Sequence, residues 1–437
     1  MHTLEDLRSG RLSGLRRLDL ACGLTEFPRE IFYLADSLEI LNLSGNRLSS
    51  LPDDLPRLHR LRIVFCSDND FTELPEVLGR CPRLEMVGFK ANRIRTVSDK
   101  ALPAKLRWLI LTDNQVDELP SEIGNCRQLQ KLMLAGNRLR SLPSRLAECT
   151  NLELLRISAN RLESLPDWLF SLPRLAWLAY GGNPLGAERE ASVLAEMPVT
   201  PVGWDELEIR RRLGEGASGV IHEAAHGAGP VALKVFKGAV TSDGLPGSEM
   251  AAWIQAGRHP NLIPVTGRLH GHPDGADGLL MPLVDPEFGV LAGPPSLESC
   301  TRDVYGPEKR FSLGAALRIA QGIASAVRHL HGRGIVHGDL YAHNILHCGE
   351  GSALLGDFGA ASFLMPEDGA SAAAIQRLEA RAFGCLLEEL VERCDAPASS
   401  GKVVDALVGL RDACLGEEVG ARPLFEDIEG TLRSLAA

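Results

Sequence analysis

The stretch LEILNLSGNRLSSLP (residues 38–52) sets the fold of the first half of the chain, because its pattern recurs along the sequence. Related copies read LQKLMLAGNRLRSLP (129–143) and LELLRISANRLESLP (152–166). Leucines at 15, 38, 61, 84, 106, 129, 152 and 175 open the copies, so the period is 22 or 23 residues. Leu41 and Leu43 are two positions apart, which places both on one side of a short strand. The pattern predicts about eight stacked copies that share one core.

Two further positions of the pattern predict packing roles. Buried asparagine amides can satisfy backbone groups of neighbouring turns, and the candidates are Asn46, Asn92, Asn114, Asn137, Asn160 and Asn183. Cys81, Cys126 and Cys149 each precede a repeat leucine by three residues, so we expect them to fill an equivalent apolar position. The copies resemble the leucine-rich repeat family, which implies an α/β solenoid. We expect the solenoid with its caps, including a helix after residue 183, over residues 1–197 and a linker over 198–206.

One column of residues on the predicted strands is unusually apolar for a solvent side. Strand alternation places it on the concave face, where six of its eight members are large and apolar: Ile40, Ile63, Met86, Trp108, Leu154 and Trp177. A contiguous apolar surface of this kind is typical of a binding site. We expect either a protein partner on this face or docking of the chain's own second domain. Tolerated surface is the remaining alternative.

Length, charge and cysteine spacing exclude several classes of protein. The 437 residues are enough for two or three domains, and the net charge of −11 leaves no basic footprint for nucleic acid. We expect no membrane span, since no apolar run approaches about 18 residues. The ten cysteines form no CxxC pair, which argues against a zinc site. The N-terminal residues show no signal-peptide core, so we expect a cytoplasmic protein with reduced cysteines.

The second half opens with a glycine-rich turn between two strand-like runs. In LEIRRRLGEGASGVIHEAA (207–225), Val220 and Ile221 continue as a strand after the glycines, whereas a dinucleotide-binding turn would continue as a helix. Glycines without side chains let backbone N–H groups approach phosphates. Lys234 follows on the next apolar strand, and contact with phosphate explains a lysine there. Glu249, on a helix that we expect Ser248 to open, is its candidate partner.

An acidic and amide-bearing loop completes the set. IVHGDLYAHNIL (335–346) places Asp339 five residues before Asn344, and GDFG (356–359) adds Asp357. The order of glycine loop, lysine, glutamate, aspartate, asparagine and DFG resembles the protein kinase family over about 207–437. The resemblance implies a two-lobed α+β domain that uses ATP and Mg²⁺, with Asp339 as catalytic base and the Lys234–Glu249 pair beside it. It also implies that Asn344 and Asp357 hold the metal. The implied ATP site comprises Leu213, Gly214, Gly216, Gly219, Ile221, Ala232, Lys234, Met281, Val284 and Asn344.

The chain departs from the family pattern at three points. Gly338 stands where most protein kinases carry an arginine that binds activation-loop phosphate, and Tyr341 stands where many carry a lysine. MPE (365–367) resembles the family's APE, so that only AASFL (360–364) separates it from DFG. The pattern thus lacks both the phosphate-binding arginine and an activation loop of the usual length. We therefore expect an active serine/threonine or dual-specificity kinase that is not controlled by activation-loop phosphorylation.

Two alternatives stay open at this point. A pseudokinase scaffold would use its repeats for binding and transfer no phosphate. A small-molecule phosphotransferase is the other alternative, because HGD followed by asparagine also resembles the aminoglycoside and choline kinase type. Retention of the nucleotide and metal residues argues against the scaffold, whereas the repeats and the VALK strand argue against the small-molecule enzyme.

Overall fold

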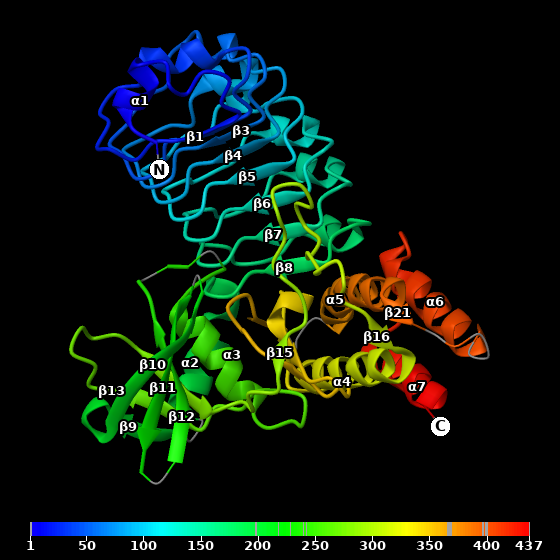
Figure 1. Cartoon of the computed structure of the whole chain (residues 1–437). Helices are drawn as coiled ribbons and strands as arrows, with labels where there is room; N and C mark the ends of the chain where they lie inside the picture. Colours follow the sequence, from blue (N-terminus) through cyan, green and yellow to red (C-terminus); the bar gives the residue numbers. More distant parts are fainter. Residues whose placement is uncertain are drawn as a thin grey trace. The chain divides into compact units, whose positions relative to one another are not determined.

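The computed structural model describes residues 2–196, 199–216, 218–227, 229–238, 240–241, 243–364, 369–395, 397 and 401–436 (Figure 1). It divides into two compact units. The first comprises Met1–Leu155 and Asn160–Leu172, and the second comprises Arg156–Ala159 and Pro173–Ala437. The second unit therefore contains the end of one repeat strand and the whole of the last repeat. The domain boundaries expected from the sequence stay a prediction.

The repeats form a parallel sheet whose strands follow one another in chain order. Its strands are β1 (Arg17–Asp19), β2 (Ile40–Asn42), β3 (Ile63–Phe65), β4 (Met86–Gly88), β5 (Trp108–Ile110), β6 (Lys131–Met133), β7 (Leu154–Arg156) and β8 (Trp177–Ala179). The register pairs equivalent positions of successive repeats, for example Ile40 with Ile63 and Ile63 with Met86. The α/β solenoid predicted from the leucine spacing is confirmed.

Short helical turns return the chain from each strand to the next. They are η1 (Arg29–Leu34), η2 (Leu55–Arg57), η3 (Glu76–Arg80), η4 (Asp99–Ala101), η5 (Ser121–Asn125), η6 (Ser144–Glu148) and η7 (Asp167–Ser171). Helix α1 (Leu4–Arg8) precedes the first strand, and a capping box of Thr3 and Asp6 satisfies its N-terminal groups. The repeat leucines after Leu15 are buried, as are Cys81, Cys126 and Cys149, so the predicted packing role of these cysteines is confirmed.

The asparagine ladder is also confirmed, and the structure adds a member to it. Asn46 donates from Nδ2 to the Leu20 carbonyl at 2.8 Å and accepts the Cys22 N–H at 3.0 Å. Asn69 makes equivalent bonds, from Nδ2 to the Leu43 carbonyl at 2.9 Å and from the Leu48 N–H at 2.9 Å. The sequence interpretation missed Asn69 because its repeat reads CSDND rather than the usual leucine, small residue and asparagine.

The second unit begins with a six-stranded, mainly antiparallel sheet in the order β10-β11-β12-β14-β13-β9. Its strands are β9 (Thr200–Gly203), β10 (Leu207–Glu215), β11 (Gly219–His226), β12 (Gly229–Phe236), β13 (Gly267–His270) and β14 (Gly278–Pro282). Within the expected linker, β9 pairs in parallel with β13, and η8 (Trp204–Glu206) follows it. Helices α2 (Pro184–Glu196) and α3 (Pro246–Ala256) accompany this sheet. Val202 and Leu233 belong to its core.

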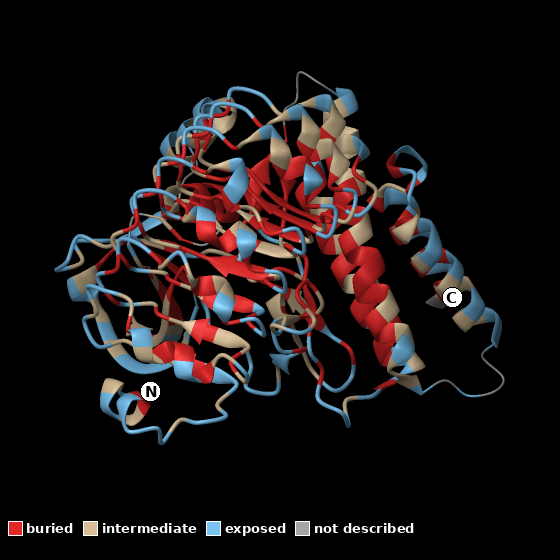
Figure 2. Ribbon diagram, turned by 90° about the horizontal axis from the view of Figure 1, so that it is seen from above, coloured by how far each residue is buried: buried red, intermediate tan, exposed pale blue. Residues whose placement is uncertain are grey.

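The rest of the unit is mainly helical. Its helices are α4 (Leu313–Gly332), α5 (Gly369–Glu392), α6 (Gly401–Leu415) and α7 (Phe425–Ala436), with short turns η9 (Ala342–Asn344) and η11 (Val419–Ala421). Small strands connect them: β15 (Gly289–Val290), β16 (Phe311–Ser312), β17 (Ile335–Val336), β18 (Ile345–His347), β19 (Ala353–Leu355), β20 (Ser362–Phe363) and β21 (Cys394–Asp395). Figure 2 shows buried residues along the strands and on the helices, with exposed residues over their outer faces. The predicted two-lobed α+β domain is confirmed.

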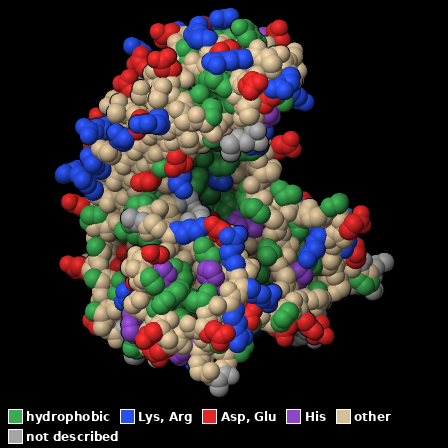
Figure 3. All heavy atoms as spheres, turned by 60° about the vertical axis from the view of Figure 1, so that its left-hand side comes forward, with side chains coloured by type: hydrophobic (Ala, Val, Ile, Leu, Met, Phe, Trp, Pro, Cys, Tyr) green, Lys and Arg blue, Asp and Glu red, His purple; other side chains and the backbone are tan. Residues whose placement is uncertain are grey.

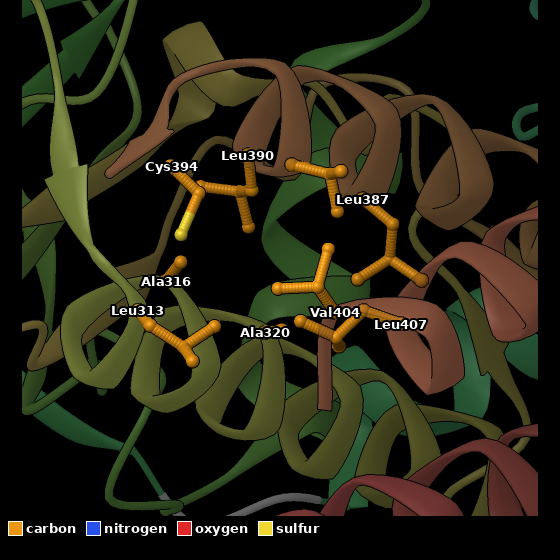
Figure 4. Close-up of a pocket in the computed structure, with 9 residues that line it drawn as sticks. Leu313, Ala316, Ala320, Leu387, Leu390, Cys394, Val404 and Leu407 are labelled. Carbon is orange, nitrogen blue, oxygen red and sulfur yellow. The ribbon is translucent and has the colours of Figure 1, made fainter. Parts of the chain in front are cut away.

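A small cavity lies among the helices of this part (Figure 4). Leucine, alanine and valine side chains of α4, α5 and α6 line it together with Cys394, so it offers no charged group to a ligand. On the face shown in Figure 3, acidic and basic side chains are interspersed. Among the described residues, no helix combines the length and the apolar character that crossing a bilayer requires.

Candidate active site

Lys234 and Glu249 form a buried ion pair between the sheet and helix α3. Lys234 lies toward the C-terminal end of β12, and its Nζ contacts Glu249 Oε1 and lies 3.7 Å from Asp357 Oδ1. Burial alone would lower the pKa of Lys234, but the carboxylates of Glu249 and Asp357 raise it above the ordinary value. The lysine is thus held as a cation at the point where the resemblance places the ATP phosphates.

Helix α3 begins earlier than the sequence predicted. Pro246 occupies its first turn and Leu245 is the N-cap residue, so the prediction that Ser248 opens this helix was wrong. Proline suits the first helical turn because its missing N–H needs no partner there. Ser248 lies inside the helix instead, and its hydroxyl donates to Glu190 Oε2 of α2 at 2.7 Å. Glu190 Oε1 accepts the Gly182 N–H at 2.8 Å, so α3 is tied to the last repeat.

The residues predicted for ATP come together on one face of the sheet. Ile221 pairs with Lys234, and Ala232 pairs with Met281, so these four side chains share a face. Leu213, which precedes the glycine turn, is exposed, whereas Ala232 and Met281 are buried. Val284 follows the end of β14 and is half-buried. The arrangement matches an apolar slot beside a cation.

The glycine turn closes the hairpin of β10 and β11. The Gly216 N–H donates to the Gly219 carbonyl at 2.9 Å. A Cβ on Gly219 would lie 2.6 Å from the Val235 carbonyl oxygen, so packing requires this glycine. Apart from the chain neighbours, no atom of the described residues lies within 4 Å of a Cβ built on Gly214 or Gly216. These two glycines therefore leave open space in which another group can approach the backbone.

Asp339 and Asn344 are locked together in the loop between β17 and β18. Asn344 Nδ2 donates to the Asp339 carbonyl at 2.9 Å and to its Oδ2 at 2.8 Å. The Gly338 N–H donates to Glu379 Oε1 of α5 at 2.8 Å, and Glu379 Oε2 lies 2.7 Å from His331 Nε2. Glu379 is buried, so helix α5 anchors the loop through this carboxylate. The loop is therefore held by hydrogen bonds at Gly338, Asp339 and Asn344.

Asn344 directly precedes β18 and Asp357 follows β19, and the antiparallel pairing of these two strands brings the two residues to the same end. The Gly356 N–H donates to the Asn344 carbonyl at 3.1 Å, and Asp357 follows directly. Asp357 has a φ of 54°, a conformation that costs energy outside glycine and that clusters at functional sites. Its carboxylate is half-exposed. The side chain is therefore presented to solvent next to the Lys234 ammonium.

A carboxylate and an amide oxygen are ligands that suit Mg²⁺, which binds proteins through few side chains when phosphates supply the rest. Asn344 Nδ2 donates to the Asp339 carboxylate, so the amide oxygen of Asn344 is the atom that can bind a metal ion. Among the described residues, no three His, Cys, Asp or Glu side chains cluster as an all-protein metal site would require. Asn344 and Asp357 thus fit a phosphate-bound Mg²⁺.

Sequence reasoning missed one residue of the site, Arg156 at the end of β7. Its guanidinium is almost fully buried, and its Nη2 forms an ion pair with Asp339 Oδ1. Nε donates to Asp243 Oδ1 at 2.9 Å, and Nη1 donates to the Gly338 carbonyl at 2.9 Å. Burial alone would raise the pKa of Asp339, but Arg156 and, more weakly, His343 lower it below the ordinary value. The Asp339 carboxylate is therefore held ionised.

The last repeat also explains the two unusual residues of the loop. Gly338 has a φ of 72°, and a Cβ there would lie 2.6 Å from the carbonyl oxygens of both Leu178 and Ala360. The ring of Tyr341 stacks on Trp177, with centroids 4.2 Å apart and planes 6° from parallel. Trp177 Nε1 also donates to the Leu340 carbonyl at 3.1 Å. The carbonyl groups of Leu178 and Ala360 thus leave no room for an arginine at position 338. At position 341, Trp177 provides a stacking partner for the tyrosine ring.

The predicted concave column is not uniformly open. Trp177 is 1% exposed and lies against Tyr341. Whether a protein partner or the chain's own second domain covers the column stays a prediction. Ile63, Met86 and Leu154 are also buried, whereas Ile40 and Trp108 are half-buried.

His343 is held by a carboxylate rather than turned toward Asp339. Its Nδ1 lies 2.7 Å from Asp303 Oδ1, and its backbone N–H donates to Asp303 Oδ2 at 2.9 Å. Burial alone would lower the pKa of His343, but the hydrogen bond and charge of Asp303 raise it above the ordinary value. The histidine adds positive potential near the loop.

The segment after DFG is short and bound to the last repeat. Strand β20 pairs with β17, and Tyr180 donates from its backbone N–H to Ser362 Oγ and from its hydroxyl to the Phe363 carbonyl, both at 3.0 Å. The predicted MPE motif (365–367) lies outside the described residues, and α5 begins at Gly369. Up to Leu364 the segment is therefore held by its pairing with β17 and by its hydrogen bonds with Tyr180.

Comparison with known families and proteins agrees with this architecture. The protein kinase domain matches residues 207–376, and leucine rich repeats match residues 37–58 and 127–185. The chain is 29% identical over 184 residues to cyclin-dependent kinase 11.1 of Caenorhabditis elegans, which is 40% of this chain and 24% of that protein. It is 25% identical over 195 residues to the serine/threonine-protein kinase mos of Xenopus laevis, 44% of this chain and 52% of the relative.

A bacterial relative is the DNA damage-responsive serine/threonine-protein kinase RqkA of Deinococcus radiodurans, 31% identical over 173 residues, 37% of this chain and 24% of that protein. The alignments thus span between a quarter and about half of the length of these relatives. A solved leucine-rich repeat protein of Leptospira interrogans aligns with 41% of this chain and 52% of its own, at 28% identity and a TM-score of 0.37. The chain carries leucine-rich repeats and a protein kinase domain.

Proposed function

We propose that this chain is an ATP-dependent protein kinase that phosphorylates serine or threonine hydroxyls. The observation that carries the proposal is the assembled pair of Lys234 and Glu249 beside Asp357, together with the hydrogen-bonded Asp339 and Asn344. A scaffold without catalysis has no need to bury a lysine against a glutamate at this position. The relatives named as serine/threonine kinases favour the same acceptor class.

The residues would divide the work as follows. Lys234 binds and orients phosphate oxygens of ATP, while Glu249 holds the lysine in place. Asn344 and Asp357 would hold Mg²⁺, which neutralises developing charge on the phosphates when it is bound. Asp339 orients the acceptor hydroxyl and takes its proton, a role that needs an ionised carboxylate within hydrogen-bond reach.

The proposed kinase does not depend on phosphorylation of the segment after DFG. Gly338 leaves no arginine to bind a phosphate there, and Tyr180 already fixes Ser362 and Phe363. Treatment of the active protein with a phosphatase should therefore leave its rate unchanged, whereas a kinase switched in this segment would lose activity.

The direct test uses the purified chain with labelled ATP and Mg²⁺, alone and with generic protein acceptors. Asp339→Asn should lower the turnover rate by about 10²-fold or more, because a positioned base is lost, while ATP binding stays largely intact. Lys234→Met should weaken ATP binding or its productive geometry. Asp274→Asn, a change of the same kind on an exposed loop, is the matched control.

The two alternatives give different outcomes in the same assay. If the unchanged chain binds no nucleotide, the chain is better described as a pseudokinase scaffold. If phosphate passes to an aminoglycoside or to choline but to no protein, the chain is a small-molecule phosphotransferase. Equal turnover in the parent and in Asp339→Asn would remove the catalytic assignment of this residue.

We also propose that the repeats bind a protein partner and that the chain works in the cytoplasm. Ile40 and Trp108 remain half-exposed on the concave strands, which supports a binding surface there. All ten cysteines are free thiols, as expected in a reducing compartment. A protein that co-purifies with the parent chain and is lost with Trp108→Ala would support the partner.

A further inference from the structure

The catalytic loop carries no arginine or lysine between residues 335 and 346. Gly338 and Tyr341 bring no positive charge to Asp339, and His343, which acts on Asp339 more weakly than Arg156 does, is bound by Asp303. The Asp339 side chain is only 17% exposed. A buried carboxylate without a cation is costly, so its charge has to be met from another part of the fold. Arg156, 183 residues earlier in the chain, meets it.

We propose that Arg156 is a positioning residue of the kinase reaction, which holds the Asp339 carboxylate in the orientation that accepts the proton of the substrate hydroxyl. The inference rests on the proposed kinase activity. It assigns to the last repeats a part in the chemistry, in addition to any partner that the rest of the solenoid binds.

The geometry of the guanidinium supports a positioning role. A guanidinium is planar, permanently charged and carries donors in a fixed fork. Here the fork reaches three acceptors: the Asp339 carboxylate, the Gly338 carbonyl and Asp243 Oδ1. Two of these belong to consecutive residues of the catalytic loop, so Arg156 fixes both the backbone at 338 and the side chain at 339.

The carboxylate keeps capacity for a substrate. Arg156 binds Oδ1 and Asn344 Nδ2 binds Oδ2 at 2.8 Å, which sets the plane of the carboxylate from both sides. An ionised carboxylate has about four lone-pair sites, and these two contacts use two of them. Since the side chain is not fully covered, a hydroxyl can still approach it. Arg156 thus orients the base without replacing the substrate.

The strand end that carries Arg156 is held in place by the neighbouring strand, β8. The Ile157 N–H donates to the Ala179 carbonyl at 2.8 Å, which ties the end of β7 to β8. From β8, Trp177 stacks on Tyr341 and bonds the Leu340 carbonyl. The contacts of Trp177 with residues 340 and 341 and those of Arg156 with residues 338 and 339 cover four consecutive loop positions. Contacts at several consecutive positions keep the side chains of a site in a fixed geometry.

The test measures turnover, KM for ATP and for the acceptor, and ATP affinity in the full-length chain. Arg156→Ala should lower the turnover rate by about 10²-fold, a typical loss when a catalytic group is misplaced, while ATP affinity changes by less than about threefold. Arg156→Lys should recover part of the loss because it restores the charge without the fork. Added guanidinium ion at millimolar concentration should raise the rate of Arg156→Ala.

Two further variants keep the test decisive. Arg156→Gln retains the volume and one donor, so it serves if Arg156→Ala does not fold, and it should show the same loss of turnover. Arg161→Ala removes an exposed arginine of the adjoining segment and should behave as the parent.

Other outcomes overturn the inference. Parent-like turnover in both Arg156→Ala and Arg156→Gln would show that Asp339 needs no such partner. A higher turnover would show that the contact blocks the base. Loss of ATP binding together with turnover, with no recovery by lysine or guanidinium, would reduce Arg156 to a structural residue. An inactive parent chain would instead remove the proposed function.

Discussion

Two separate parts of the chain restrict which residue can stand at position 338. The positive φ of 72° there favours glycine, and a Cβ would meet the Leu178 and Ala360 carbonyl oxygens at 2.6 Å. The sequence alone explains the absent arginine by the absence of a phosphate to bind. The structure adds a steric reason, because the backbone of the last repeat occupies the space.

Restoring the family arginine should therefore damage the protein. Gly338→Arg should destabilise the fold by about 1–3 kcal/mol or more through backbone strain, and should lower turnover because the loop shifts. Thermal melting and steady-state kinetics measure the two effects. Gly349→Arg, at an exposed glycine with nothing within 4 Å of its Cβ, is the control. A more active and equally stable Gly338→Arg would contradict the steric account.

Trp177 and Trp108 occupy equivalent strand positions but differ in what surrounds them. Trp177 is 1% exposed and stacked on Tyr341, so Trp177→Ala should cost about 3–5 kcal/mol and lower turnover. Trp108 is half-buried beside the Lys131 ammonium, which lies 4.4 Å from its ring centre, so Trp108→Ala should cost less and leave turnover unchanged. Chemical denaturation and kinase assays give both comparisons. Equal losses in the two variants would contradict this distinction.

At the scale of elements, helix α2 acts as a brace for helix α3. Glu190 accepts one bond from Ser248 and one from Gly182, so it connects α3 to the last repeat. Glu190→Ala should destabilise this contact by about 1–3 kcal/mol, because two buried or half-buried donors lose their acceptor. Amide exchange within Pro246–Ala256 should accelerate, and KM for ATP should rise as the Lys234–Glu249 pair loosens. Glu196→Ala, exposed at the end of α2, should change neither.

Helix α5 supports the catalytic loop through a buried carboxylate. Glu389 accepts from Tyr305 Oη at 3.0 Å and from Arg302 Nε at 3.2 Å, on either side of Asp303, which holds His343. Burial raises the pKa of Glu389 to about 7, although Arg302 acts in the opposite direction. A raised pKa in the folded state means that the folded chain binds the proton more tightly than the unfolded chain does.

The resulting stability is present below the ordinary pKa of glutamate, roughly 4.3, and is lost as the pH rises to about 7. Glu389→Gln mimics the protonated form, so its melting temperature should exceed that of the parent at pH 8 and approach it at pH 5. Glu392→Gln, on the same helix and exposed, should follow the parent at both values. A parent-like pH dependence in Glu389→Gln would contradict the shift.

The sequence predicted those elements whose residues lie close together in the chain. The repeat strands, the glycine hairpin and the lysine strand follow from local patterns that recur or alternate, and the structure confirms them. Ser248 misled because a serine before a helical run is a frequent N-cap, whereas Pro246 two residues earlier fits the first turn. Asn69 was missed because its repeat departs from the common pattern.

Arg156 could not be predicted as part of the site, because its partners lie 87 and 183 residues further along the chain. One signal was available. The neighbouring repeats carry Ile110 and Met133 at this strand position, although Asp19 and Asn42 show that other repeats place polar residues there, so the signal is weak. A buried arginine needs an acid nearby, although the pattern does not say which acid.

At the scale of the whole molecule, the second compact unit begins before the protein kinase match at residue 207. Arg156, Trp177 and Tyr180 all bond residues of the catalytic loop or of the segment after DFG. A fragment cut at the sequence boundary therefore exposes surface that the last repeat covers. It also loses the cation of Asp339.

A fragment of residues 199–437 should accordingly be inactive, bind a hydrophobic dye and melt below the full-length chain. A fragment of residues 129–437 retains Arg156 and the last repeat, so it should keep more activity and melt at a higher temperature. Comparison of the two by kinase assay and thermal melting tests the prediction. A fully active fragment 199–437 would show that the catalytic loop needs nothing from the repeats.

The fit between Gly338 and the Leu178 carbonyl also bears on how such a protein can change over generations. Modular proteins usually exchange their binding arrays freely, since a linker isolates each module from its neighbour. Here an array acquired by recombination would have to arrive with an arginine at 156 and a tryptophan at 177, or the acquired halves would not work together. We therefore expect the last repeats and the kinase domain to be inherited together and to change in a coordinated way.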